Sequence, residues 1–325
     1  MSERGTMGAG TIVVDTETHL FERAWPIETM PDAPLYEHVH WHAHDGHLLV
    51  SEMARANVDL ALVIGYDGYD FQLFMERLGS SPADFYGGER YARSFVEQYP
   101  DRLALFTALK DPRVRESLGR LEQQLEGGAI GTKFFPAYLG LSFDHPSIAP
   151  VLDLVERSGR CLMVGLEDSA DIAEELRAAT RILAERPGLH VQFNHGANVR
   201  FDVAEEVEAL RALVRATESV FISSSVLGGP LMEWEDGTEY PFPRWLAKLE
   251  RLIDAVGPGR AVWGTDWPWF EHFGKYPQFV DAVRFHAQFL NDEERGAYLG
   301  GNACRYLRRD PAAHAGKEHT CLMTS

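Results

Sequence analysis

Short apolar runs alternate with amphipathic segments along almost the whole chain. The near-continuous apolarity of these runs is typical of strands buried on both faces of a parallel sheet. The segments between them follow the helical period: residues 202–217, for example, place Val203, Val207, Leu210 and Val214 at helical spacing. We therefore expect eight strands, at residues 11–15, 59–65, 103–109, 129–135, 161–165, 189–194, 220–224 and 260–265.

The alternation of eight strands with helices predicts an α/β fold, a single (β/α)8 TIM-type barrel with its active site at the C-terminal ends of the strands. No linker rich in proline or serine interrupts the pattern, so we assign residues 11–309 to one barrel domain. Residues 1–10 and 310–325 are small, polar and aperiodic, and we expect them to be flexible termini.

Composition narrows the range of partners. The 325 residues include 31 Lys and Arg against 49 Asp and Glu, a net charge of −18, which repels phosphate backbones and anionic lipid surfaces. The chain has neither a secretory signal nor an apolar stretch long enough to span a membrane. Its three cysteines, Cys161, Cys304 and Cys321, are too few and too scattered for a disulfide framework. We expect a cytoplasmic protein that binds a small molecule, and neither nucleic acid nor a membrane.

Polar residues stand at four of the expected strand ends: Glu17 and His19 follow the first strand, Lys133 lies on the fourth, His195 follows the sixth and Asp266 the eighth. Glu17 and His19 are two residues apart, so in an extended chain both face the barrel mouth, and a carboxylate with an imidazole suits Zn²⁺, Mn²⁺ or Fe²⁺. Taken alone, the pair is better explained as a hydrogen-bonded pair at a strand end. Its coincidence with His195 and Asp266 favours a metal site.

Five motifs in this order resemble those of one family: VVDTETH, GTKFFP, FNHGA, VWGTDWP and GGNACRYL, between residues 12 and 307. Together they resemble the amidohydrolase-related branch of the amidohydrolase superfamily, which comprises metal-dependent hydrolases, lactonases and non-oxidative decarboxylases. The resemblance implies that Glu17 and His19 bind one divalent metal ion, Zn or Mn. It also implies that Asp266 binds the ion or takes a proton, and that His195 is a ligand or an acid/base.

One position departs from the family pattern. The family usually places a metal-binding histidine at the end of the fifth strand, where this chain has Gly165 in the segment CLMVGLED. Glu167 or Asp168 could substitute from further along the chain, or His195 could swing in. A third alternative is a metal that binds weakly or not at all.

Several residues near the expected mouth are candidates for substrate binding. Lys133 could hold a substrate carboxylate or pair with Glu167 or another carboxylate. The histidine-rich segment 38–47 allows a second metal site, a pH-responsive lid, or a solvated loop that lends one histidine to the pocket. The aromatic residues of the mouth loops hint at a flat or aromatic substrate. The full set of substrate-binding candidates is Lys133, Glu167, Trp267, His44 and Arg200, of which Arg200 is more readily explained as structural.

These residues favour a metal-dependent hydrolase that cleaves an amide, ester or lactone of a small substrate with metal-activated water. Asp266 would accept the proton of that water, and His195 would stabilise or protonate the developing charge. The alternative is non-oxidative decarboxylation of an aromatic carboxylate. A different class is a non-catalytic barrel that has lost its metal, for which Gly165 is the main support. A homodimer is common in the family that the chain resembles, and no surface stripe of the sequence demonstrates one.

Overall fold

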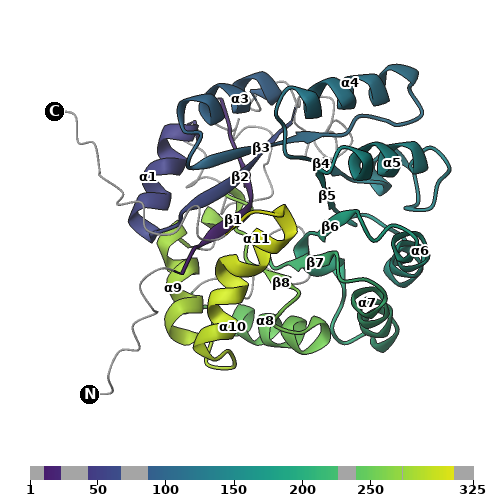
Figure 1. Cartoon of the computed structure of the whole chain (residues 1–325). Helices are drawn as coiled ribbons and strands as arrows, with labels where there is room; N and C mark the ends of the chain where they lie inside the picture. Colours follow the sequence, from purple (N-terminus) through teal and green to yellow (C-terminus); the bar gives the residue numbers. More distant parts are fainter. Residues whose placement is uncertain (1–10, 23–42, 67–86, 226–238, 273, 311–325) are drawn as a thin grey trace, which may run out of the picture.

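The computed structural model describes residues 11–22, 43–66, 87–225, 239–272 and 274–310. Within them the predicted (β/α)8 barrel is confirmed: eight strands are hydrogen-bonded in chain order, and all their pairings are parallel (Figure 1). Of the termini expected at 1–10 and 310–325, all residues except Asp310 lie outside the described residues. The strands are β1 (Val14–His19), β2 (Leu60–Gly65), β3 (Leu103–Ala108), β4 (Gly131–Phe134), β5 (Cys161–Val164), β6 (His190–Phe193), β7 (Val220–Ser223) and β8 (Ala261–Val262).

The barrel closes between β1 and the segment around β8. The Thr16 amide donates to the Trp263 carbonyl at 3.2 Å, and the Asp266 amide donates to the Glu17 carbonyl at 2.9 Å. Further along, the His19 amide donates to the Trp267 carbonyl at 2.7 Å. These backbone bonds place the residues around Glu17 directly beside those around Asp266.

Six strands lie within two residues of their predicted bounds, and two, β1 and β8, differ by more. The first strand was expected at residues 11–15 and runs Val14–His19, so Glu17 and His19 lie inside it instead of after it. Burial of their polar groups is tolerated because each has a partner: Glu17 pairs with Lys133, and His19 bonds Asp266. The eighth strand was expected at 260–265 and is only Ala261–Val262.

The helices form an outer ring around the strands (Figure 1). In α7 the buried residues include Ala209, Leu210, Leu213 and Val214, so the apolar face of this amphipathic helix packs on the sheet. None of the described helices is long and apolar enough to cross a membrane. The helices of the described chain are α1 (Gly46–Ala56), α3 (Gly88–Gln98), α4 (Arg115–Glu126), α5 (Ala149–Arg157), α6 (Ile172–Ala184), α7 (Ala204–Ala216), α8 (Pro243–Val256), α9 (Tyr276–His286), α10 (Asp292–Gly296) and α11 (Asn302–Leu307), with short turns η4 (Ala137–Leu139), η5 (His195–Asn198), η6 (Trp269–His272) and η7 (Ala297–Gly301).

The last helix, α11, lies over the middle of the ring of strands and covers one end of the barrel (Figure 1). Its Tyr306 hydroxyl donates to the Leu162 carbonyl at 2.9 Å, and the Cys161 thiol donates to the Tyr306 carbonyl at 3.2 Å. The Asn302 amide donates to the carbonyls of Pro258 and Ala261, both at 2.7 Å. The GGNACRYL motif is therefore a structural closure at the N-terminal ends of β5 and β8.

Candidate metal centre and active site

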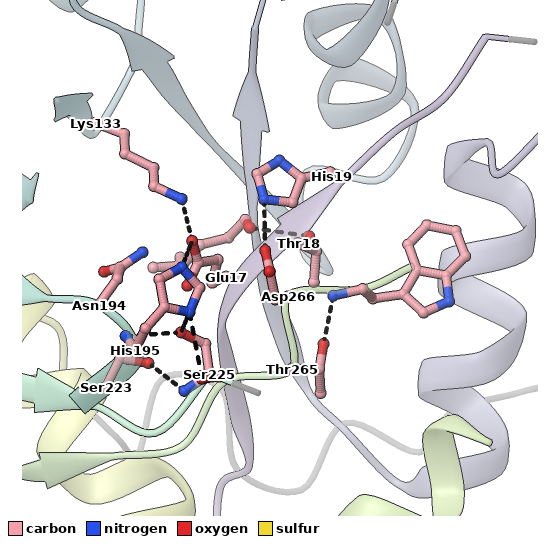
Figure 2. A network of polar contacts seen from close by, with 12 residues as sticks. Glu17, Thr18, His19, Lys133, Asn194, His195, Ser223, Ser225, Thr265 and Asp266 are labelled. Carbon is pink, nitrogen blue, oxygen red and sulfur yellow. Dashed lines mark hydrogen bonds and ion pairs between the residues drawn. The ribbon is translucent and has the colours of Figure 1, made fainter. Parts of the chain in front are cut away.

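The structure brings side chains from four strand ends to one buried cluster (Figure 2). Glu17 comes from β1 itself, Lys133 from β4, His195 from the turn after β6, and Asp266 from the segment after β8. All four are buried, as is His19. The four residues that the sequence predicts as metal ligands therefore lie together at the C-terminal ends of the strands; they are Glu17, His19, His195 and Asp266.

Glu17, His195 and Asp266 each offer a ligand atom within 4.8 Å of those of the other two, and this is the only such group found among the described residues. The Glu17 Oε2 atom is buried and has no hydrogen-bond partner among the described residues. Carboxylate and imidazole groups are normal ligands of Zn²⁺ and Mn²⁺, and a buried acceptor without a partner is what a bound cation would satisfy. These three residues fit one divalent metal ion.

His19 lies beside this group of three without belonging to it. Its Nε2 donates to Asp266 Oδ1 at 2.8 Å, and its ring stacks on Tyr66 with the ring centroids 5.1 Å apart. His19 therefore fixes the orientation of the Asp266 carboxylate. Its own role as a ligand stays a prediction.

His195 is held from one side and faces carboxylates on the other. Its Nδ1 lies 3.3 Å from the Ser225 carbonyl and 3.1 Å from the Ser225 hydroxyl. Its Nε2 lies 3.0 Å from Glu167 Oε1 and 3.7 Å from Glu17 Oε1. Burial lowers the pKa of His195, but the carboxylates of Glu17 and Glu167 outweigh burial and raise it to about 9. The space around Nε2 thus requires positive charge, from a proton or from a metal ion.

The two carboxyl groups of the cluster have pKa values that are shifted in opposite directions. Burial would raise the pKa of Glu17, but Lys133 and His195 outweigh it and lower the value to about 2. Burial and the Glu17 charge raise the pKa of Asp266, although His19 opposes this. Such separation of two neighbouring carboxyl groups is how sites assign different acid and base roles. Asp266 is the carboxyl group that is suited to accept a proton.

The backbone at two of these residues is strained. His195 has φ 52° and Asp266 has φ 59°, both in the left-handed region. For a residue with a Cβ atom this conformation costs about 1–2 kcal/mol. Strained residues cluster at functional sites, where the surrounding structure holds them in place.

The place of the missing fifth-strand histidine is filled by two other side chains. A Cβ atom on Gly165 would lie 2.2 Å from the Phe135 ring and 2.3 Å from Glu167 Oε2. Because Glu167 also reaches His195 Nε2, its carboxylate enters the cluster from the loop after β5. Asp168, the other substitute considered from the sequence, is exposed.

Lys133 is paired inside the cluster. Its ammonium group donates to Glu17 Oε1, and its side chain is only 2% exposed. The same Nζ lies 4.7 Å from the ring centroid of Phe135 and 5.6 Å from that of Tyr66. Of the alternatives that the sequence left open, the pairing with a carboxylate is present, and the carboxylate is that of Glu17.

The other substrate-binding candidates lie outside the cluster. Trp267 and His44 are fully buried and share one partner: Trp267 Nε1 donates to Glu271 Oε1 at 2.9 Å, and His44 Nε2 lies 3.3 Å from Glu271 Oε2. Arg200 is exposed and is paired with Glu206, its Nε donating at 2.9 Å. Within the histidine-rich segment, residues 38–42 lie outside the described residues.

The sequence reasoning missed two residues that hold the site. The Asp15 carboxylate accepts from the Thr265 amide at 2.9 Å, the Thr265 hydroxyl at 2.6 Å and the Tyr276 hydroxyl at 2.8 Å, which ties β1 to the segment before Asp266. Ser225 holds His195. An acid inside an apolar run and a run of serines after the seventh strand were the available signals.

The family model described as amidohydrolase matches residues 14–309. The chain belongs to the amidohydrolase family. This confirms the resemblance seen in the motifs.

Solved structures of the amidohydrolase fold resemble the chain over nearly its whole length. An amidohydrolase from Burkholderia multivorans with bound zinc is 17% identical, with a TM-score of 0.64, over 92% of this chain and 100% of that one. The 5-carboxyvanillate decarboxylase of Novosphingobium aromaticivorans with bound manganese is 12% identical, with a TM-score of 0.61, over 94% and 100% of the two chains. At these identities the likeness concerns the fold.

One protein of known activity resembles part of the chain. The L-fucono-1,5-lactonase of Burkholderia ambifaria is 32% identical over 85 residues, which is 24% of this chain and 28% of the lactonase. The match spans less than a third of the lactonase, so its substrate does not transfer directly to this amidohydrolase.

Proposed function

We propose that this member of the amidohydrolase family is a metal-dependent hydrolase that cleaves an amide, ester or lactone bond of a small substrate. The observation that carries the proposal is the convergence of Glu17, His195 and Asp266, all buried and within 4.8 Å of one another. The zinc-bound amidohydrolase structure and the partial match to a lactonase support it. One divalent ion, Zn or Mn, is the cofactor.

Each residue of the cluster has a distinct role in this proposal. Glu17, His195 and Asp266 would hold the ion, which would polarise the substrate carbonyl and lower the pKa of a water molecule. His195 takes the ligand role because its Nδ1 is engaged by Ser225 and its Nε2 faces the carboxylates. Asp266 accepts the proton of the attacking water while His19 keeps its carboxylate in orientation. Lys133 brings positive charge toward the oxygen on which negative charge develops.

The first test is metal content, measured by elemental analysis of untagged protein. We expect about one equivalent of Zn or Mn in the wild type, as in catalytic zinc sites, and its loss in the double variant Glu17→Gln/Asp266→Asn. Glu205→Gln, at an exposed position of α7, is the matched control that should keep the metal. Absence of metal from the wild type, even after reconstitution, would overturn the proposal in favour of a non-catalytic barrel.

Decarboxylation of an aromatic carboxylate is the second candidate. The aromatic rings of Tyr66 and Phe135 beside Lys133 favour it, and manganese-bound decarboxylases share the fold. Metal-loaded protein should be assayed with a panel of esters, amides and lactones and, separately, with aromatic carboxylates for release of CO₂. Turnover confined to the second set would replace hydrolysis by decarboxylation.

The proposal also covers the cellular compartment, the partner and the oligomeric state of the protein. We place the protein in the cytoplasm, because Cys161 and Cys304 are both buried and free of disulfides. Its partner would be a small molecule, as in the related structure from Acinetobacter baumannii that holds citric acid. A homodimer stays a prediction, which light scattering on purified protein would test.

A further inference from the structure

A cavity of about 300 Å³ adjoins the cluster at the ends of β2, β3 and β4. Its lining includes the rings of Tyr66, Phe135 and Tyr138 together with Leu109 and Leu139. Lys133 also lines the cavity, and the same lysine pairs with Glu17. The cavity and the candidate metal centre therefore share one residue.

We propose that this cavity binds a flat, largely apolar ring of the substrate and directs the bond to be cleaved toward Lys133 and Glu17. The substrate class would then be aryl or similarly planar amides, esters or lactones, and polyhydroxylated sugar lactones would be excluded. The proposal rests on the proposed hydrolase function and specifies its substrate.

The walls of the cavity present aromatic faces. Phe135 and Tyr138 are stacked, with centroids 4.8 Å apart and an interplanar angle of 19°. Tyr66 lies across from Phe135, with centroids 6.4 Å apart. The Tyr66 ring also stacks on His19. A planar ring gains offset-stacked or edge-to-face contacts with such walls that a saturated ring does not make.

Gly165 is part of the same arrangement. A side chain at this position would overlap the Phe135 ring, since even a Cβ atom would lie 2.2 Å from it. The loss of the fifth-strand side chain is thus what admits Phe135 to the wall of the cavity. The departure from the family pattern and the aromatic lining are one structural change.

Most of the surface that lines the cavity is apolar, although Lys110, Asp111, Ser117 and Lys133 also contribute to it. The Asp111 carboxylate, which also lines the cavity, already accepts from Arg113 at 2.7 and 2.9 Å. Hydroxyl groups set against Phe135 and Leu109 would lose their hydrogen bonds to water without replacement, which penalises binding. The volume lies at the small end of the range of roughly 300–1,000 Å³ for ligand pockets, which suits a single ring.

Calorimetry with neutral probes tests the ring preference separately from catalysis. Benzamide, cyclohexanecarboxamide and L-fucose would be titrated into metal-loaded protein. We expect benzamide to bind about two- to tenfold more tightly than cyclohexanecarboxamide, as one aromatic contact allows, and L-fucose to bind most weakly. Equal binding of the two amides, tightest binding of L-fucose, or no binding of benzamide at millimolar concentration would overturn the proposal.

Variants of the lining residues test whether the preference for benzamide arises in this cavity. Phe135→Leu should abolish the preference for benzamide, whereas Phe285→Leu, at a residue 56% exposed on α9, should leave it unchanged. Val114→Trp provides a second variant at an exposed residue that lines the cavity, where folding tolerates the change and the indole should weaken benzamide binding. Retention of the full preference by Phe135→Leu, or benzamide binding in Val114→Trp as tight as in the wild type, would contradict the assignment.

The two proposals fail in different ways. Bound metal and ester hydrolysis without a ring preference would refute the cavity assignment and leave the hydrolase. A ring preference in protein that binds no metal would refute the hydrolase and leave the cavity assignment.

Discussion

Around His195, side chains from three parts of the chain converge on one imidazole. Ser225, after β7, holds Nδ1, while Glu17 from β1 and Glu167 from the loop after β5 face Nε2. A ligand held by hydrogen bonds to its other nitrogen has a fixed tautomer and ring orientation. Ser225 is therefore the residue that positions His195, whereas Glu167 brings a negative charge beside Nε2, the atom that would hold the ion. The sequence suggested for Glu167 either a metal ligand or a contact with substrate.

Replacing Glu167 should weaken the metal site without unfolding the protein. Loss of a side chain that contacts a metal ligand typically lowers metal affinity about 10- to 100-fold, and we expect Glu167→Gln, which removes a negative charge from beside the ion, to fall in this range. Competition with a chromophoric chelator measures the affinity directly. Asp168→Asn, at the exposed neighbouring residue, is the control; an affinity in Glu167→Gln equal to that of the control would show that the Glu167 carboxylate does not contribute to the metal site.

Gly165 offers a test of the packing beside the cluster. The methyl group of Gly165→Ala would overlap Phe135 and Glu167, and overpacking of this kind costs about 1–3 kcal/mol of unfolding free energy. Gly119, inside α4, has nothing within 4 Å of an added Cβ, so Gly119→Ala should stabilise the protein by about 0.5–1 kcal/mol. Urea denaturation measures both variants, and equal effects would contradict the packing described for Gly165.

The sequence predicted which residues meet but not all of their contacts. Glu17, Lys133, His195 and Asp266 were identifiable because each lies on or directly after an apolar run, and parallel strands bring these points to one end of the barrel. The entry of Glu167 was one of several alternatives. Which of them holds depends on how Phe135 packs against Gly165, a long-range contact that local pattern does not encode.

At the scale of elements, the bounds of most strands were predictable, and those of β1 and β8 were not. β2 and β7 lie within one residue of their expected bounds, because their apolar runs stop where the strands stop. β1 continues through Glu17 and His19, since partners on β4 and after β8 make polar side chains tolerable in its buried interior. β8 ends at Val262, and the residues that follow it form backbone hydrogen bonds with β1.

The last helix shows how one polar side chain holds an element in place. Asn302 is 2% exposed, and its amide satisfies the carbonyls of Pro258 and Ala261. Asn302→Ala would remove the donor from the buried Ala261 carbonyl and from the half-buried Pro258 carbonyl, so we expect a loss of about 2–3 kcal/mol in unfolding free energy. Thermal and urea unfolding measure the loss, with Glu293→Ala on the exposed part of α10 as the control. A loss no larger than that of the control would show that α11 is held by its apolar contacts alone.

At the scale of the whole molecule, the two ends of the barrel have different functions. The C-terminal ends of the strands carry the buried acids and His195, whereas the N-terminal ends are closed by α11 and its contacts to β5 and β8. Separation of a reactive end from a stabilising end is the general division of labour in this fold. It explains why the closing motif GGNACRYL belongs to the family pattern although it contributes nothing to the site.

Two buried thiols, those of Cys161 and Cys304, lie at the N-terminal end of the barrel. Their reactivity reports whether α11 and the barrel unfold as one unit. Burial raises the pKa of Cys161, on β5, to about 12 and that of Cys304, on α11, to about 11, so neither thiol should react while the barrel is closed. In a Cys321→Ser background we expect no labelling by a chromogenic disulfide under native conditions and two reactive thiols in guanidinium.

The dependence of this labelling on metal separates two kinds of opening. Metal held at the far end of the barrel stabilises the closed state by mass action, so it slows the labelling of a thiol that is exposed only by global unfolding. We expect excess Zn or Mn to slow the reaction of Cys161, which α11 and the barrel wall both cover. Cys304 should respond less, because detachment of α11 alone would expose it. Mass spectrometry of partly labelled protein distinguishes the two sites, and equal slowing of both would show that α11 and the barrel unfold together.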